Sequence, residues 1–321
     1  MTGPGLTATV LQPCPVCGGE SRFSFRSGDR LHALPGEYDY AECTGCQAVF
    51  QTPTPSGEAI AAFYPDEYSP YRIGKTRRRN PVERAVLRAR YGYRHLESPL
   101  PDWLGRVVGL FAYGKSVPWM PNGRMLDVGC GGGANLRAMQ ALGWEPHGVD
   151  FNPVAVQTCR QSGLDVFHGE LSQAGFPDGT FDLVSAHHVI EHMADPAALV
   201  REAFRILKPG GMLLLRTPNS AALGRAWLGT DWYANDVPRH LILFSPDNLA
   251  LLVETAGFQR RVIKTSSTPK ILLNSLDYRR GAQGQVSKSR RPLRMLARMY
   301  MTAAAITGRG DEIFAIFRKP G

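Results

Sequence analysis

The sequence predicts an α/β protein with a doubly wound parallel sheet and a small N-terminal lobe that depends on cysteines. Three observations lead to this prediction. A short apolar run over residues 125–128 enters a glycine-rich turn, which is the usual start of a doubly wound sheet. Three further short strands follow it along the chain. Near the N-terminus, four cysteines form two Cys-x2-Cys pairs.

Length and composition fit an ordinary globular protein. The chain has 321 residues, of which 43% are hydrophobic, so it can bury a core as one large domain or two smaller ones. It has no run of about 18 apolar residues, so we expect no transmembrane helix. The N-terminal residues lack a basic start followed by a long apolar stretch, so we expect no secretory signal and a cytoplasmic protein.

The net charge of +9 is concentrated in two segments. Residues 72–94 contain nine Lys/Arg and one acidic residue, and residues 260–298 contain eleven and one. The rest of the chain is therefore acidic, with a net charge of −9. Basic segments attract phosphates, anionic lipids or nucleic acids, and they also occur as ordinary solvated helix faces.

The N-terminal lobe contains two cysteine pairs, Cys14-x2-Cys17 and Cys43-x2-Cys46, with 25 residues between them. This spacing lets four thiolates surround one zinc ion, so we predict a zinc ribbon over residues 1–50. A redox dithiol is the alternative, although one pair would suffice for it. Because four protein ligands leave no open coordination position, we expect the zinc to be structural.

A basic helical connector is predicted over residues 51–120. Asn80 and Pro81 form a typical helix start. Apolar residues recur behind it at helical spacing, namely Val82, Ala85, Val86, Ala89 and Tyr93. Four interpretations of this amphipathic helix stay open: packing on the following domain, an anionic membrane surface, a phosphorylated ligand, or nucleic acid.

The central fold begins with a strand, a glycine turn and a helix. The strand Met125–Val128 enters the turn at residues 129–133, and a helix is predicted over Ala134–Leu142. Glycines let the backbone approach a ligand closely at the N-terminus of such a helix. The acidic Asp127 precedes the turn. The G-x-G-x-G spacing differs from the G-x-G-x-x-G spacing of dinucleotide-binding proteins.

Three more strands follow the glycine turn. The first ends at Asp150, the place where an acidic side chain binds ribose hydroxyls in nucleotide-binding sheets. The second covers Asp165–His168 and ends before Glu170, and the third covers Phe181–Ala186. The carboxyl ends of these strands are where ligands bind in open α/β sheets.

A long insertion interrupts the C-terminal part of the chain. Residues 266–310 separate two predicted strands, Phe258–Thr265 and Glu312–Arg318. The insertion is basic and partly helical, over Pro292–Ile306. Loops of this length in compact domains are usually functional or disordered.

Six segments occur in a fixed order over residues 124–265: LDVGCGGG, GVD, HGE, FPDGTFDLV, VIEH and ILKPGGMLLLRTPN. In this order they resemble the motifs of class I S-adenosylmethionine (SAM)-dependent methyltransferases. Two further features resemble the ubiquinone-biosynthesis O-methyltransferase-like branch of this family more closely. One is the sequence VPRHL at 237–241, and the other is the cysteine knuckle followed by Phe63, Tyr64 and Tyr68. The resemblance implies SAM as cofactor and a seven-stranded Rossmann-like sheet whose last strand, near residues 311–318, is antiparallel.

The resemblance also implies roles for individual residues. The floor of the SAM pocket would consist of Asp127, Gly129, Gly131 and Gly133. Asp150 would bind the ribose, and the adenine would contact Phe151, Glu170 and Leu171. Glu170 stands where an Asp is commoner, which changes the reach of the acid. His187 and His188 would lie near the methionine part of SAM, and Tyr68 would act as a lid.

Methyl transfer to oxygen or carbon also requires removal of a proton from the acceptor, which a base accelerates about 10²–10⁴-fold. Histidine suits this task because it titrates near neutrality. Candidates are His240, which follows an aromatic-rich loop over residues 218–238, His192, and His188. We predict His240 as the first candidate and His192 as the second. Structural hydrogen bonding is the alternative role for each histidine.

Two other functions are open. One is an RNA methyltransferase that docks its substrate through the zinc ribbon. Enzymes that methylate amino groups of nucleic acids usually carry an Asn/Asp-Pro-Pro-aromatic motif after the fourth strand, where this chain has His187-His188-Val189-Ile190; nucleic acid is therefore disfavoured. The other is a noncatalytic SAM-binding protein.

The sequence thus predicts a zinc ribbon over residues 1–50, a connector over 51–120, and a methyltransferase domain over 121–321 with the insertion 266–310. The expected reaction is SAM-dependent methylation of a small-molecule, saccharide or lipid-linked acceptor, preferentially at oxygen. Peripheral contact with an anionic inner-membrane surface is one expectation for the basic segments. The acceptor and the oligomeric state do not follow from the residues.

Overall fold

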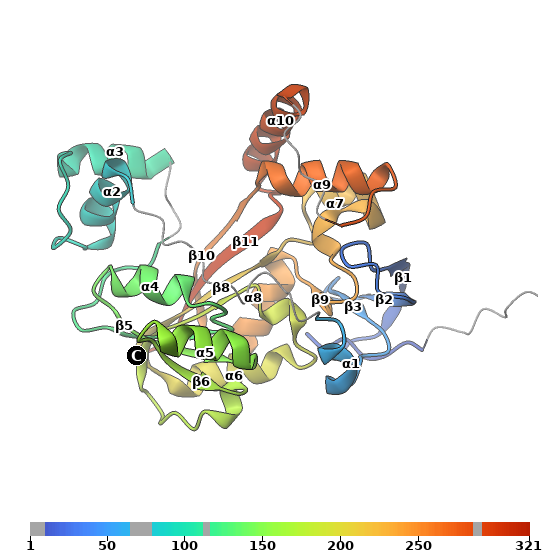
Figure 1. Cartoon of the computed structure of the whole chain (residues 1–321), viewed down its shortest axis with the longest axis horizontal. Coiled ribbons are helices and arrows are strands. Elements are labelled where there is room, and N and C mark those ends of the chain that lie inside the picture. The colour runs from blue at the N-terminus through green and yellow to red at the C-terminus, as the bar shows by residue number, and fades with distance from the viewer. Residues whose placement is uncertain (1–9, 65–78, 112–115, 285–290) are drawn as a thin grey trace, which may run out of the picture. The chain divides into compact units, whose positions relative to one another are not determined.

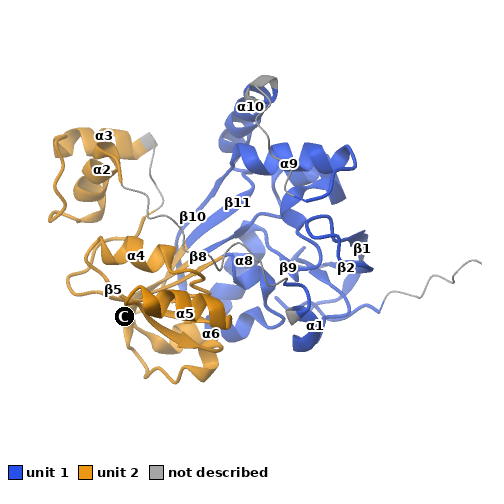
Figure 2. Cartoon of the chain, viewed as in Figure 1, with its two compact units in different colours: residues 1–66, 188–201, 215–315 blue, residues 67–187, 202–214, 316–321 orange. Residues whose placement is uncertain are grey.

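The structure of the chain is a computed structural model that describes residues 10–64, 79–111, 116–284 and 291–321. It divides into two compact units (Figure 2). The ribbon unit contains residues 1–66, 188–201 and 215–315, and the glycine-loop unit contains residues 67–187, 202–214 and 316–321. The three-part domain division stays a prediction, because these units interleave along the sequence.

The central sheet has seven strands in the order β10-β11-β8-β7-β4-β5-β6, and its last strands are antiparallel (Figure 1). Its strands are β4 (Arg124–Val128), β5 (Glu145–Asp150), β6 (Asp165–His168), β7 (Phe181–His187), β8 (Leu207–Pro218), β10 (Gln259–Ser266) and β11 (Glu312–Arg318). Strand β4 pairs in parallel with both β5 and β7. The predicted seven-stranded fold is confirmed.

The helices that follow these strands begin where local sequence favours them. Helix α4 (Ala134–Gln140) starts directly after the glycine turn. Helix α5 (Pro153–Gln161) has Pro153 in its first turn, and the Asn152 side chain accepts hydrogen bonds from the first free backbone amides. The other helices of this part are α6 (Pro196–Ile206), α7 (Leu223–Leu228) and α8 (Pro246–Thr255).

The cysteine-containing lobe is a four-stranded antiparallel sheet in the order β1-β2-β3-β9. Strands β1 (Ser21–Gly28), β2 (Glu37–Cys43) and β3 (Val49–Gln51) are neighbours in sequence, and α1 (Gly57–Ala61) follows them. The fourth strand, β9 (Ile242–Leu243), comes from a distant part of the chain and pairs with β3. The lobe is therefore completed by residues that immediately follow His240.

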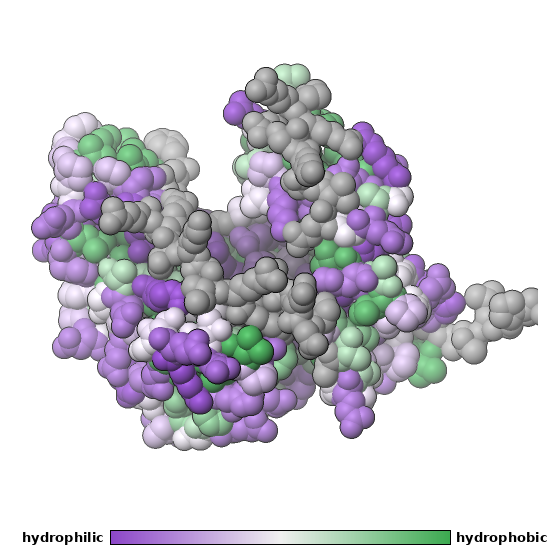
Figure 3. Space-filling model, viewed as in Figure 1, coloured by the Kyte–Doolittle hydropathy of each residue, from purple (hydrophilic) through white to green (hydrophobic). Residues whose placement is uncertain are grey.

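The helix predicted to start at Asn80 and Pro81 is confirmed. Helix α2 (Pro81–Tyr91) begins with a capping box between Asn80 and Glu83, and it packs on α3 (Asp102–Phe111). The two helices approach closely at Gly105, where a Cβ atom would lie 2.3 Å from the Ala85 carbonyl oxygen. Ala85 and Val86 of the apolar stripe are thus buried in a helix that packs on α3. Packing of α2 on the following domain stays a prediction. Hydrophobic residues remain at the surface over this helix pair (Figure 3).

The helix predicted over Pro292–Ile306 in the insertion is confirmed, and a second helix at 269–279 was not predicted. Helices α9 (Pro269–Arg279) and α10 (Arg291–Thr307) lie between β10 and β11 in the sequence. Within the part of the chain that the structure describes, no helix combines the length and the apolar character needed to cross a membrane.

Candidate functional site

The glycine turn after β4 requires glycine for steric reasons. Gly129, Gly131 and Gly133 have φ angles of +65°, +51° and +73°, a region that side chains rarely adopt. At Gly133, a Cβ atom would lie 2.6 Å from Leu164 Cδ1 and 2.8 Å from Cys159 Sγ. The turn therefore brings bare backbone to the N-terminus of α4, where amide groups can face a ligand.

Asp150, at the end of β5, anchors this turn. Its carboxylate is buried and accepts hydrogen bonds from the amides of Gly131 at 2.7 Å and Asn152 at 2.9 Å. Burial raises the pKa of Asp150, and these two hydrogen bonds oppose the rise. The side chain predicted to bind ribose is thus already fixed against the glycine turn.

Asp127 is a buried residue of β4, two positions before Gly129 of the turn. Its Oδ1 accepts hydrogen bonds from Ser185 Oγ at 2.6 Å and from Asn135 Nδ2 at 3.0 Å. Burial raises its pKa to about 6, against the effect of those hydrogen bonds. Asp127 therefore joins β4, α4 and β7 just before the glycine turn.

The residues predicted to contact adenine follow β5 and β6. The Phe151 side chain is 57% exposed beside Asp150. Glu170 is exposed and its amide donates to Gln173 Oε1 at 2.8 Å, whereas Leu171 is buried. These positions leave Phe151 and Glu170 accessible to a ligand, and their contact with adenine stays a prediction. The predicted lid residue Tyr68 lies outside the described residues.

His187 ends β7 in the glycine-loop unit, and His188 begins the next stretch of the ribbon unit. His188 has a φ of +55° and a half-exposed side chain. Its Nδ1 lies 3.1 Å from Glu191 Oε1 and its Nε2 lies 3.2 Å from Glu312 Oε1. Burial lowers the pKa of His188, but the two carboxylates outweigh it and raise the pKa overall. His188 is therefore a cation held by two acids, which makes it a poor candidate base.

The two preferred histidines lie together in the ribbon unit. The rings of His192 and His240 have centroids 4.8 Å apart. His192 Nδ1 lies 2.9 Å from the Arg239 carbonyl oxygen and 2.9 Å from the Tyr64 hydroxyl, and His240 Nδ1 lies 2.9 Å from the Ala234 carbonyl oxygen. A carbonyl can only accept, so each Nδ1 carries the hydrogen in the neutral ring. Each Nε2 therefore has a lone pair.

A buried carboxylate completes this cluster. Glu191 is 0% exposed, and its Oε2 atom has no hydrogen-bond partner among the residues that the structure describes. Burial raises the pKa of Glu191, but the His188 hydrogen bond and the nearby imidazoles lower it to about 2 overall. Burial, together with His192, lowers the pKa of His240 to about 4. At neutral pH the cluster thus combines a charged carboxylate with a neutral His240.

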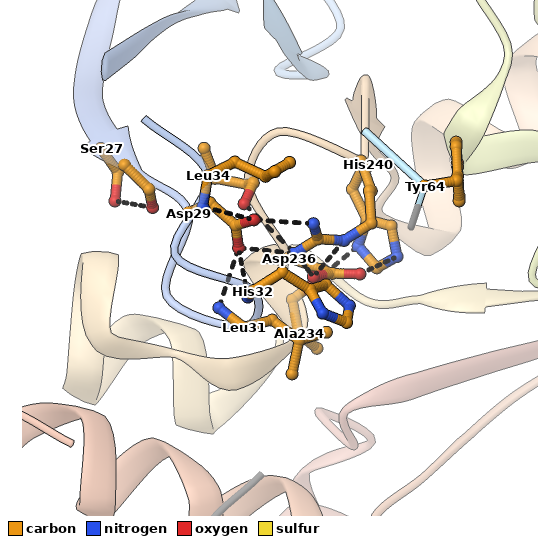
Figure 4. Close-up of polar contacts among 12 residues, drawn as sticks. Ser27, Asp29, Leu31, His32, Leu34, Tyr64, Ala234, Asp236 and His240 are labelled. Atoms are coloured by element: carbon orange, nitrogen blue, oxygen red, sulfur yellow. Dashed lines mark hydrogen bonds and ion pairs between the residues drawn. The ribbon is translucent and has the colours of Figure 1, made fainter. Parts of the chain in front are cut away.

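The loop that carries His240 is fixed by a buried ion network (Figure 4). The Arg239 guanidinium donates to both Asp29 oxygens, at 2.9 and 2.8 Å, and to Asp236 Oδ1 at 2.7 Å. The side chains of Arg239 and Asp29 are fully buried. Because Asp29 follows β1, this network attaches the cysteine lobe to the residue next to His240.

The four N-terminal cysteines meet as the sequence predicts. One donor atom from each of Cys14, Cys17, Cys43 and Cys46 lies within 4.8 Å of the others, and the closest Sγ pairs are 3.5 and 3.6 Å apart. Four sulfurs bound to zinc at about 2.3 Å are separated by about 3.8 Å. The Val16 and Cys46 amides also point at cysteine sulfurs, at 3.4 Å each. The donor set therefore fits a tetrahedral zinc site.

Sequence reasoning missed three residues near His240, namely Asp29, Asp236 and Glu191. Arg239 within VPRHL carried a usable signal, because an arginine among apolar residues requires a buried carboxylate partner. Asp29 could not be assigned to it, since the two positions are separated by 210 residues.

Comparison with known proteins was consistent with this architecture. The profile of a methyltransferase domain matches residues 94–262. A ubiquinone biosynthesis O-methyltransferase of Xanthomonas campestris pv. campestris (strain B100) is 35% identical over 153 residues, which cover 44% of this chain and 64% of that protein. Another from Xanthomonas oryzae pv. oryzae (strain PXO99A) is 36% identical over 149 residues, covering 42% and 62%.

The match thus spans less than two thirds of the length of these curated relatives. Among solved structures, an S-adenosylmethionine-dependent methyltransferase from Mesorhizobium loti superposes with a TM-score of 0.45 at 18% identity, covering 63% of this chain and 94% of that one. The methyltransferase-domain match alone covers more than half of the chain. The chain therefore belongs to the class I SAM-dependent methyltransferase family.

Proposed function

We propose that the chain transfers a methyl group from SAM to an oxygen atom of a small-molecule, saccharide or lipid-linked acceptor. The observation that carries this proposal is the glycine turn with three left-handed glycines, anchored by the buried Asp150. The named relatives are O-methyltransferases, which supports oxygen as the methylated atom.

In this reaction the S–CH3 bond of SAM breaks and an O–CH3 bond forms, and the electron pair of the broken bond stays on sulfur. SAM supplies the reactive methyl group, and the protein aligns it with the acceptor. The acceptor hydroxyl must also lose its proton. His240 is the first candidate to accept it and His192 the second, because each has its Nδ1–H fixed by a carbonyl and a lone pair on Nε2.

The proposed function predicts that Asp150→Ala weakens SAM binding about 10–100-fold, because charge-assisted hydrogen bonds contribute about 1.5–3 kcal/mol. Calorimetric titration with SAM measures this effect. The matched control is Asp165→Ala, which removes an exposed carboxylate of the same unit that pairs with His147. Equal SAM affinity in wild type and Asp150→Ala would contradict the assigned cofactor site.

Methyl transfer itself is tested in cells that are fed methyl-labelled methionine. Extracts of small molecules, saccharides and lipids are compared between wild-type cells, deletion cells and cells complemented with Asp150→Ala. The proposal expects one labelled species that is lost in the deletion and is not restored by Asp150→Ala. Restoration by that variant, or identical labelling in all three strains, would argue for a noncatalytic role.

We also propose that Cys14, Cys17, Cys43 and Cys46 bind one structural zinc ion. The proposal is supported by the sulfur separations and by the two amides directed at sulfur. With four protein ligands the ion has no open position, so it stabilises the lobe and takes no part in methyl transfer.

We further propose that α3 contacts an anionic membrane surface, which fits a lipid-linked acceptor. Trp103, Val107 and Leu110 are exposed on one face of α3, with Trp103 64% exposed, and the segment 72–94 beside it in sequence is strongly basic. An apolar face next to basic residues is typical of helices that lie at an anionic lipid surface.

Trp103→Glu is expected to abolish flotation of the chain with anionic phosphatidylglycerol vesicles at low salt, because it places a negative charge in the membrane-facing surface. Trp227→Glu, which changes another exposed tryptophan on α7, is the control and should still float. If the wild-type chain binds neither anionic nor neutral vesicles, the membrane proposal is wrong. If it binds RNA instead, a nucleic-acid acceptor is favoured.

A further inference from the structure

Two cysteines that the proposed function does not use lie at the glycine turn. Cys130 belongs to the turn and Cys159 to α5, and both are free thiols. Cys130 is 7% exposed and Cys159 is 0% exposed. They share one apolar cluster with Leu136 and Leu164, and the whole cluster belongs to the glycine-loop unit. Packing alone explains a small apolar side chain at each position, but it does not explain a thiol at both.

The two thiols converge on one backbone carbonyl of the turn. Cys159 Sγ lies 3.2 Å from the Gly131 carbonyl oxygen, and Cys130 Sγ lies 3.9 Å from the same atom. The two thiols are also hydrogen-bonded to each other. In the reduced pair the Cys130 thiol donates to the Cys159 sulfur, and the Cys159 thiol donates to the carbonyl. Sulfurs from two different elements are therefore direct neighbours behind the turn.

The surroundings of Cys159 favour its reactive form. The hydrogen bond from Cys130 lowers the pKa of Cys159, burial opposes this effect, and the charge of Arg137 lowers the pKa again. The thiolate is the form of cysteine that reacts with oxidants and disulfides. A thiolate in contact with a second thiol is the arrangement in which oxidation ends in a disulfide.

We propose that Cys130 and Cys159 are a redox-sensitive pair that hydrogen peroxide converts to a disulfide, and that this disulfide weakens SAM binding. The Cys159 thiolate attacks one peroxide oxygen, the O–O bond breaks, and the departing hydroxide takes up a proton to become water. The Cys130 thiol then attacks the sulfenic acid on Cys159, the S–S bond forms, and the second oxygen leaves as water. Two thiols are oxidised and one peroxide is reduced. The peroxide reaches the pair from the side of Cys130, which is the exposed member.

The disulfide acts on the turn because both sulfurs already touch bare backbone. A Cβ atom on Gly148 would lie 2.9 Å from Cys130 Sγ, and one on Gly133 would lie 2.8 Å from Cys159 Sγ. A disulfide draws the sulfurs to about 2.05 Å from each other, closer than any hydrogen bond. It also removes the thiol that donates to the Gly131 carbonyl. The strain therefore falls on Gly131, whose amide is held by Asp150 at 2.7 Å.

The effect on SAM binding rests on the proposed function, whereas formation of the disulfide does not. Trypsin cleaves after Arg124, Arg137 and Arg160, and it therefore releases peptides 125–137 and 138–160 with one cysteine each. The full chain is treated with hydrogen peroxide, alkylated, digested without reductant and analysed by mass spectrometry. SAM affinity of the same samples is measured by calorimetric titration, before and after addition of dithiothreitol. For the oxidised wild type we expect the two peptides to be linked, SAM binding to be about 10-fold weaker, and dithiothreitol to reverse both changes.

The matched variant is Cys159→Ser, which keeps a hydrogen-bond donor for the Gly131 carbonyl but cannot form the disulfide. It also retains the four ribbon cysteines, so any effect of peroxide on them appears in this variant too. Its SAM affinity should be the same before and after peroxide. Unlinked peptides in the oxidised wild type, linked peptides with unchanged SAM affinity, or an equal loss of affinity in Cys159→Ser would each overturn the redox pair as a switch. Reduced wild-type protein that does not bind SAM would instead contradict the proposed function, and the linked peptides would still show whether the pair is oxidised.

Discussion

Replacement of Arg239 with methionine is expected to destabilise the ribbon unit by about 3–5 kcal/mol, the usual consequence of removing one partner from a buried ion pair. The variant leaves the fully buried Asp29 carboxylate without its two charge-assisted hydrogen bonds, and it also frees Asp236. Hydrogen exchange of the backbone amides of β2 under native conditions measures the loss, because it reports the opening free energy of the lobe.

The matched control is Arg22→Met in the same sheet. Arg22 pairs with Glu42 at 3.0 Å, but its side chain is 69% exposed, so the expected loss is below about 1 kcal/mol. If both variants exchange at the wild-type rate, the Arg239 network does not stabilise the lobe. An Arg239→Met variant that keeps full stability but loses activity would indicate that the network serves only to position His240.

Cys43→Ser is expected to unfold the cysteine lobe and to remove one equivalent of zinc. Binding of structural zinc contributes about 10–16 kcal/mol of apparent free energy in small zinc domains, far more than such a lobe can lose and remain folded. The readouts are the zinc content of the purified chain and rapid hydrogen exchange throughout β1 and β2.

Cys159→Ala provides the control, because Cys159 is buried against Leu136 and Leu164 in the glycine-loop unit, whereas the four-cysteine cluster belongs to the ribbon unit. It should retain the wild-type zinc content and wild-type exchange in the lobe. Full zinc content in Cys43→Ser would exclude Cys43 as a ligand. If wild-type protein without bound zinc still shows slow hydrogen exchange in β2, the cysteines need no metal, as the dithiol interpretation requires.

Much of the central fold follows from local sequence. The turn after β4 requires glycine because its φ angles are positive. The strand before it is short and apolar. About ten consecutive residues are therefore enough to predict β4 and the start of α4. The helix start at Asn80 is equally local, since its capping box spans only four residues. The order of such units then indicates the topology, because parallel strands must be joined by crossovers.

The environment of His240 could not be read in this way. The Ala234 carbonyl fixes the ring of His240, and Asp29 fixes the neighbouring Arg239 side chain. No sequence pattern links positions 29 and 239. Glu191 was visible within VIEH, but its burial depends on tertiary packing. Hydrogen-bond partners that select one histidine tautomer are backbone groups, so they leave no mark in residue identity.

The pairing of β3 with β9 has a consequence for synthesis of the chain. The lobe contains its four cysteines by residue 46, whereas its last strand begins at Ile242. At about 5–20 residues per second, the ribosome needs about 10–40 s to make the intervening chain. During that interval all four cysteines are already made, whereas the edge of β3 lacks its partner strand and Asp29 lacks Arg239.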